Sequence, residues 1–105
     1  MNAVDEALAD LRREIDAVDA ELARLFERRL DAAQRIGRLK AAAGLPVTDA
    51  AREAAVLAAA RARVSPANAA SFEKLTRLLM QISKERQQEL LAATGEHLEY
   101  SKLKW

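Results

Sequence analysis

An arginine stands at position 29, where the pattern of the preceding residues predicts a leucine. Large apolar residues recur before it at steps of three and four, the spacing of one helix face: Leu8, Leu11, Ile15, Val18, Leu22 and Leu25. The next position of that face is Arg29, whose guanidinium does not give up its charge. Because burying an unpaired charge is very costly, we expect either a wet seam at Arg29 or an anionic group that meets it.

Two further cations, Lys40 and Arg12, lie on or beside the same face. Eleven residues separate Arg29 from Lys40, so both should point to nearly one side, about 16 Å apart along the axis. Such a pair could hold a small dianion. Arg12 is about 25 Å from Arg29 on its own helix. In an antiparallel pair of copies, with a two-fold axis near residue 23, it would come level with the gap between Arg29 and Lys40.

The arginine and lysine pattern therefore favours a homodimer with two composite anion sites, to which each copy donates Arg12. The alternative for Arg12 and Lys40 is that both extend into solvent, as cations on long helices often do. For Arg29 the alternative is an internal ion pair.

Other polar residues fall near helix starts or on apolar faces. Asp49, Arg52 and Glu53 share one side of the first turns of a second helix. Glu53 could accept a hydrogen bond from a ligand hydroxyl, held by Arg52, or the group could be an ordinary acidic helix start. Ser83 and Gln87 lie on or beside the apolar face of a third helix and need partners there. Those partners are either a ligand or another helix.

Three helices would position these residues, over about 4–43, 49–63 and 66–93. Gly44 is a typical C-terminal stop for the first helix, with Pro46 just beyond it. Thr48 or Asp49 is expected to cap the second helix.

The third helix has a strong predicted start and a predicted stop. Ser65 offers a capping hydroxyl and Pro66 suits the first helical position. Gly95 is expected to end the helix, so we divide the chain into a helical domain, 1–94, and a tail, 95–105. His97 and Tyr100 in that tail are expected at the surface.

The fold class expected is all-α, a helical bundle built around a long first helix. At 105 residues the chain makes one thin domain, and a first helix of about 60 Å is too long for the rest of one chain to cover. Half of the residues are hydrophobic but only 4% are aromatic, so one copy would bury a modest core. We therefore expect self-association.

Composition argues against several classes of function. Seventeen basic and sixteen acidic residues, mixed along the chain, form no basic face for nucleic acid. The lack of cysteine and the single histidine argue against a disulfide framework, thiol catalysis and a transition-metal site. No apolar run approaches the roughly 20 residues that span a bilayer. The acidic, amphipathic start is unlike a signal peptide, and a cytoplasmic protein is expected.

Four motifs in order carry a resemblance to a known family: LRREIDAVDAELARLFERR, IGRLK, GLPVTDAAREAAVL and SKERQ. With them the sequence resembles the small all-helical (type II) chorismate mutases, from about Leu8 to Leu91. The resemblance implies an intertwined homodimer whose long first helices cross between protomers. Two features depart from the family pattern: Gln81 and Ile82 replace an acidic pair before Ser83, and the tail lies outside the match.

The resemblance implies a role for each cation and donor. Arg29 corresponds to the arginine that binds a substrate carboxylate, and Arg12 to the arginine that the other protomer contributes to the second carboxylate. Lys40 corresponds to the lysine that contacts the ether oxygen and a carboxylate. Gln87 corresponds to the second donor to the ether oxygen, and Ser83 to a serine near a carboxylate.

The second helix and the walls of the site are implied in the same way. Glu53 and the helix start at Asp49 correspond to the groups that hold the ring hydroxyl, with Arg52 beside them. The apolar wall positions are Ile36, Val56 and Met80.

The reaction that the resemblance implies is the pericyclic rearrangement of chorismate to prephenate, with no cofactor and no metal. The family fold also acts on 4-amino-4-deoxychorismate, or eliminates pyruvate from isochorismate, so these substrates remain alternatives. A non-enzymatic alternative is a structural or regulatory helical dimer. A partner enzyme that docks on the tail is a further possibility.

Overall fold

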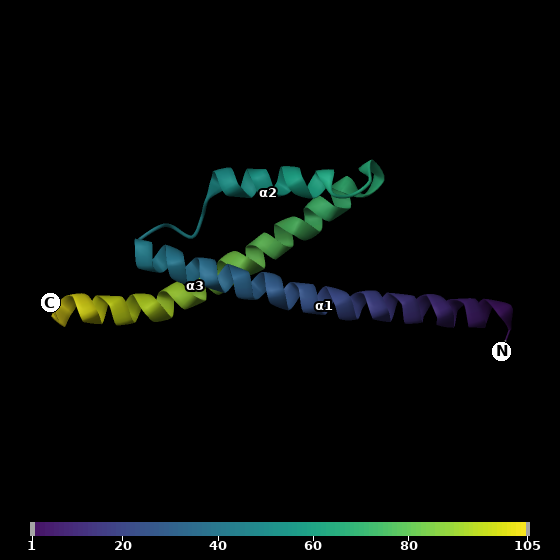
Figure 1. Ribbon diagram of the computed structural model, residues 1–105, viewed down its shortest axis with the longest axis horizontal. Helices are drawn as coiled ribbons and strands as arrows, with labels where there is room; N and C mark the ends of the chain where they lie inside the picture. Colours follow the sequence, from purple (N-terminus) through teal and green to yellow (C-terminus); the bar gives the residue numbers. More distant parts are fainter. Residues whose placement is uncertain (1, 105) are drawn as a thin grey trace. The chain divides into compact units, whose positions relative to one another are not determined.

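The computed structural model describes the backbone of residues 2–104 and the side chains of residues 2–93. Its elements are α1 (Ala3–Ala43), α2 (Ala50–Ala62), the 3₁₀ turn η1 (Pro66–Asn68) and α3 (Ala69–Lys104) (Figure 1). No strand occurs in this described backbone, so the all-α expectation is confirmed. The chain divides into a first unit, Met1–Asp31, and a second unit, Ala32–Trp105.

The first unit is the N-terminal part of α1. Its helix begins with a side-chain cap, because Asn2 Oδ1 accepts a hydrogen bond of 2.8 Å from the backbone N–H of Asp5. Asp5 and Glu6 place negative charge in the first turn, where the helix dipole favours it. The helix start is therefore fixed by local chemistry.

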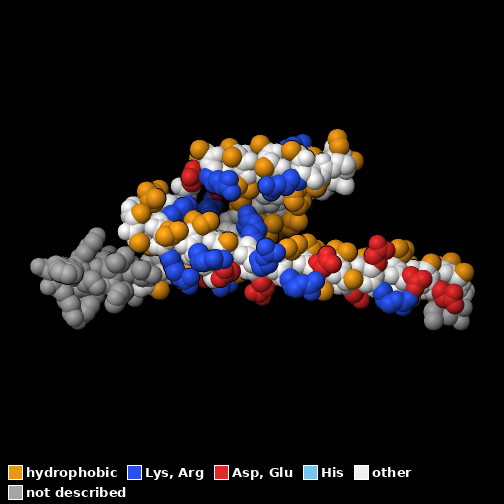
Figure 2. All heavy atoms as spheres, in the orientation of Figure 1, with side chains coloured by type: hydrophobic (Ala, Val, Ile, Leu, Met, Phe, Trp, Pro, Cys, Tyr) orange, Lys and Arg blue, Asp and Glu red, His pale blue; other side chains and the backbone are white. Residues whose placement is uncertain are grey.

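The apolar stripe of this unit is open to water. Its side chains are between 42% and 67% exposed: Val4, Leu8, Leu11, Ile15, Val18, Leu22 and Leu25. Figure 2 shows hydrophobic side chains in a row along this part of α1, with charged side chains beside them. A lone helix cannot bury such a stripe itself, so the stripe is a surface that another apolar face can cover. Among the described residues, no helix has the length and apolarity to cross a membrane.

The second unit contains the end of α1 and a hairpin of α2 and α3 joined through η1 (Figure 1). Asp49 caps α2, since its Oδ1 accepts from the N–H of Arg52 at 3.0 Å. Arg61 on α2 pairs with Glu73 on α3 at 2.6 Å and ties the hairpin. The prediction of Asp49 as one of two possible caps is confirmed.

The start of the third helix differs from the prediction. Pro66 opens a 3₁₀ turn and α3 begins at Ala69, three residues later than expected. The Ser65 hydroxyl makes no capping hydrogen bond; the Ser65 carbonyl accepts from the Asn68 N–H at 2.9 Å instead. That bond spans three residues, the spacing of a 3₁₀ helix, so the tighter turn replaces the side-chain cap.

Gly44 ends α1 as expected. It adopts a left-handed φ of 68°. The N–H of Leu45 donates to the Lys40 carbonyl at 2.8 Å and the N–H of Gly44 to the Ala41 carbonyl at 3.2 Å. This pair of bonds is the Schellman motif, which satisfies the last carbonyls of a helix.

The predicted stop at Gly95 is wrong, because α3 continues through it to Lys104. A glycine inside a helix costs only about 1 kcal/mol relative to alanine, and good helix formers follow Gly95. The segment 95–105 is thus helical as far as Lys104. The side chains of His97 and Tyr100 lie outside the described ones.

Small residues form the buried contacts of the second unit. Its buried apolar residues are Ala33, Ala60 and Ala69. Gly37 is buried where the end of α1 meets α3, and a Cβ built there would lie 2.9 Å from Cγ and 3.3 Å from Cβ of Gln87. The two helices therefore approach closely at Gly37 because no side chain separates them.

We predict that Gly37→Ala lowers the free energy of unfolding by about 1–2 kcal/mol, since overpacking outweighs the gain in helix propensity. Urea unfolding followed by circular dichroism measures this loss. Combined with Gln87→Ala, the two losses should be less than additive, because the second change removes part of the clash. A Gly37→Ala protein that gains stability would show that the helices leave room for a side chain.

Candidate active site

The polar residues singled out in the sequence are shared between the two units. Arg12 and Arg29 lie on the part of α1 in the first unit, where Arg12 is exposed and Arg29 half-buried. The others lie in the second unit: Lys40, Asp49, Arg52, Glu53, Ser83 and Gln87. In the second unit Lys40, Asp49, Glu53, Ser83 and Gln87 each make a specific contact.

Lys40 is held in place at the end of α1. Its Nζ donates a hydrogen bond of 2.8 Å to the Val47 carbonyl, and its side chain is half-buried. An ammonium has three N–H donors, so this bond leaves two for other acceptors. The contact also fastens the connector between α1 and α2 to the last turn of α1.

The start of α2 divides its polar residues between capping and pairing. The Asp49 carboxylate is used as the helix cap, and the Arg52 side chain is exposed. Glu53 was expected to be held by Arg52, but its Oε1 instead meets Lys84 Nζ at 2.8 Å. Residues adjacent in a helix do not face each other, which explains why Arg52 is not the partner.

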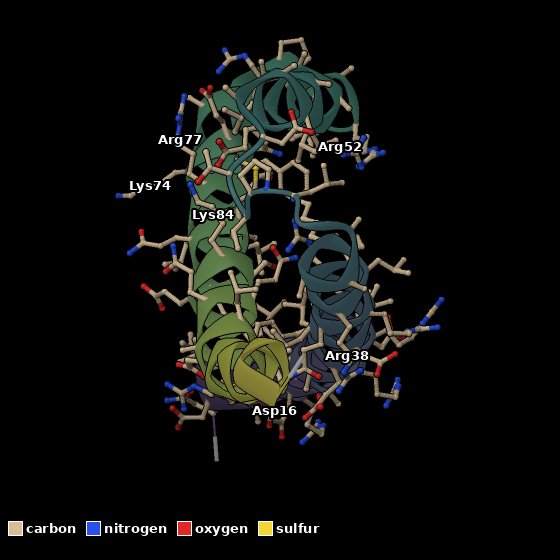
Figure 3. All side chains as sticks on the ribbon, turned by 90° about the vertical axis from the view of Figure 1, so that its left-hand side faces the viewer. Asp16, Arg38, Arg52, Lys74, Arg77 and Lys84 are labelled. Carbon is tan, nitrogen blue, oxygen red and sulfur yellow. The ribbon has the colours of Figure 1, made fainter. Side chains whose placement is uncertain are left out.

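Lys84 is the residue that sequence reasoning missed. It belongs to the SKERQ motif, between Ser83 and Gln87, and its side chain is 35% exposed. Figure 3 labels it on α3. Its position in the sequence could have identified it. Lys84 comes three residues before Gln87, and residues at this spacing are neighbours on the surface of a helix.

The two polar residues of α3 find different partners. Ser83 Oγ donates to the carbonyl of Leu79 on its own helix at 2.8 Å, so this bond is local, not interhelical. Gln87 is only 6% exposed, and its Nε2 donates at 2.8 Å to the Ala33 carbonyl on α1. The interhelical alternative is thus realised for Gln87, whose amide keeps a second N–H.

The expected wall residues differ in burial. Val56 on α2 and Met80 on α3 are half-buried, whereas Ile36 on α1 is 47% exposed. Among the described side chains no buried nitrogen or oxygen lacks a partner, and no group of their acidic residues could hold a metal ion.

The second unit therefore holds three groups in place through contacts between its elements. They are the cationic ammonium of Lys40, the uncharged amide of Gln87 and the carboxylate of Glu53. Lys40 is fixed by the α1–α2 connector, Glu53 by α3 and Gln87 by α1. Figure 3 shows side chains of these three elements meeting between the helices. An ammonium and an amide donate to a ligand's oxygens, while a carboxylate accepts from a hydroxyl.

A comparison with protein families decides what the chain is related to. The model of the chorismate mutase type II family matches residues 11–88. The chain belongs to this family. The match covers most of the chain and encloses every site residue, from Arg12 to Gln87.

Curated relatives of this chorismate mutase family member are longer proteins. The T-protein of Haemophilus influenzae is 48% identical over 56 residues, which are 53% of this chain and 15% of that protein. A bifunctional chorismate mutase/prephenate dehydratase of Aquifex aeolicus is 48% identical over 42 residues, 40% of this chain and 12% of that protein.

A third relative covers more of the chain. The 3-dehydroquinate dehydratase of Pyrobaculum aerophilum is 38% identical over 77 residues, 73% of this chain and 23% of that protein. The chain thus spans less than a quarter of the length of each of these three relatives. No solved structure matches it significantly.

We predict that Gln87→Glu makes stability depend on pH. The introduced carboxyl would face the Ala33 carbonyl and could donate to it only when protonated. Burial and this acceptor raise its pKa above the ordinary value of about 4.3. The stabilising hydrogen bond is then fully present below about pH 4.3 and is lost as pH rises through the raised pKa.

Urea unfolding of the wild type, Gln87→Glu and Gln87→Met between pH 5 and pH 8 tests this prediction. The Gln87→Glu protein should lose about 2 kcal/mol more at pH 8 than at pH 5, relative to the wild type. Gln87→Met has no titrating group and should show a constant loss. Equal losses of stability for Gln87→Glu at both pH values would show that the side chain at position 87 does not donate to the Ala33 carbonyl.

Proposed function

We propose that this chain is a chorismate mutase that rearranges chorismate to prephenate as a homodimer. The observation that carries the proposal is the family match over residues 11–88, which contains all the polar residues expected at the site. The name of one relative points the same way, since it is a bifunctional chorismate mutase/prephenate dehydratase.

The proposed mechanism needs no nucleophile and no proton transfer. The enolpyruvyl group shifts in one step, in which the ether C–O bond breaks as a C–C bond forms. The site holds the flexible dianion in its compact, chair-like conformation, with the reacting carbons close together. Arg29 and the Arg12 of a second copy hold the two carboxylates. Ser83 joins them when its hydroxyl turns from the Leu79 carbonyl to the substrate, because a hydroxyl has only one hydrogen to donate.

Electrostatic stabilisation supplies the rest of the proposed rate gain. Negative charge grows on the breaking ether oxygen, and Lys40 and Gln87 donate to it. A rate gain of about 10⁶ corresponds to about 8 kcal/mol, within reach of fixed donors combined with conformational restriction.

The contacts of the second unit support these donor roles. Lys40 and Gln87 are each held by one hydrogen bond to a backbone carbonyl, at 2.8 Å in both cases. Each keeps a further N–H for the substrate. Donors that are fixed before the substrate arrives need little reorganisation in the transition state, which is what electrostatic catalysis requires.

The apolar stripe of the first unit supports the proposed dimer. Its large side chains, from Val4 to Leu25, are open to water in the single chain. A second copy of the same helix, antiparallel with its two-fold axis near residue 23, would bury the stripe and carry its own Arg12 toward the site. The dimer thus supplies both the missing core and the second carboxylate ligand.

We expect purified protein to consume chorismate and form prephenate, and Arg29→Leu to lose this activity while keeping its melting temperature. Leucine continues the apolar stripe, so the change removes a carboxylate ligand without weakening the proposed seam. The assay follows chorismate absorbance, with 4-amino-4-deoxychorismate and isochorismate as parallel substrates. No turnover of any of them would favour a structural dimer, and an unfolded Arg29→Leu protein would make Arg29 structural.

Mixing two inactive variants tests the shared site. Arg12→Ala and Lys40→Ala should each be inactive alone. In a heterodimer one site would carry both changes and the other neither, so refolding an equal mixture should restore about one quarter of wild-type activity. If Arg12 and Lys40 act in the same chain, the mixture stays inactive.

A further inference from the structure

The ion pair between Glu53 and Lys84 joins α2 to α3 at the residue proposed to hold the substrate's ring substituent. Lys84 Nζ lies 2.8 Å from Glu53 Oε1, and the two side chains are 35% and 29% exposed. Both are therefore partly shielded from water, and the attraction between them is stronger than between fully exposed charges. The charge that Glu53 presents to a ligand is reduced by this neighbour.

We propose that Lys84 determines which ring substituent the site accepts, favouring the neutral hydroxyl of chorismate over the ammonium of its 4-amino analogue. This inference rests on the proposed function, since it concerns the substrate of that same site. Lys84 acts through Glu53, so it is a positioning and specificity residue.

The two ring substituents need different partners. A hydroxyl needs an acceptor, and Glu53 Oε2 remains one when Oε1 is bound to Lys84. An ammonium at the same place would bring a second positive charge close to Lys84. Like charges brought together in a partly buried site are costly, so the amino substrate is disfavoured.

The neighbouring residues do not offset this repulsion. The Asp49 carboxylate already accepts from the N–H of Arg52 at 3.0 Å as the helix cap. The Arg52 side chain is exposed and, as the neighbour of Glu53 in the helix, does not face it. Lys84 is thus the cation that meets Glu53, and a neutral hydroxyl suits this pair better than an ammonium does.

Selectivity built in this way uses repulsion of the wrong substrate as well as attraction of the right one. Glu53 alone would attract an ammonium more strongly than a hydroxyl, because a charged donor makes the stronger hydrogen bond. With Lys84 in contact the preference is reversed. Removal of Lys84 should therefore change the ratio between the two substrates and not only the rate.

The test compares kcat/KM for chorismate and 4-amino-4-deoxychorismate in the wild type, Lys84→Met, Lys84→Arg and Lys74→Met. We expect the wild type to prefer chorismate and Lys84→Met to shift the ratio toward the amino substrate about tenfold. Lys84→Arg keeps the charge and should keep the ratio. Lys74 is exposed on the outer side of α3 (Figure 3), so Lys74→Met changes the net charge equally and should leave both values unchanged.

Where turnover of the amino substrate is too slow to follow, its inhibition constant against chorismate measures its binding instead, and Lys84→Met should tighten that binding relative to the wild type. Equal losses for both substrates in Lys84→Met, together with a lower melting temperature, would reduce Lys84 to a structural role and overturn the inference alone. A wild type that prefers the amino substrate would also overturn it. A wild type that turns over neither substrate would overturn the proposed function as well.

Discussion

The hydrogen bond from Gln87 to the Ala33 carbonyl is the contact on which the arrangement of the second unit depends. It joins α1 to α3 across 54 residues of sequence, and it forms because Gly37 lets the two helices approach. The buried apolar residues nearby are alanines, which specify little by shape. A buried polar contact must instead be satisfied in one geometry, so it defines how these helices cross.

The other polar contacts of this unit also join its elements in defined positions. Lys40 fastens the α1–α2 connector, and Glu53 with Lys84 joins α2 to α3. Each contact holds a group that the proposed reaction uses. Lys40 keeps further N–H donors for the substrate, and Glu53 keeps its second carboxylate oxygen as an acceptor. Partly buried ion pairs stabilise a fold weakly, so their cost is better explained by the placement of chemical groups than by stability.

Local chemistry made part of this structure predictable. The end of α1 follows from Gly44 and the cap of α2 from Asp49, because each depends on residues a few positions away. The stop at Gly95 was wrong for the converse reason: a glycine permits a helix end but does not impose one. Lys84 was missed because its partner lies on another helix, and the sequence does not reveal how α2 and α3 face each other.

Burial of the apolar stripe offsets the free energy that it costs to cover Arg29 in an interface. Covering a half-buried arginine on a helix seam costs free energy, because the guanidinium loses part of its contact with water. Each large apolar side chain of the stripe contributes about 1 kcal/mol when it is covered, because only about half of its surface remains exposed in the single chain. The stripe from Val4 to Leu25 repeats in each copy of a dimer, so its burial exceeds the several kcal/mol that removing a charged group from water costs. A strong apolar seam is therefore the condition under which a binding cation can be kept within it.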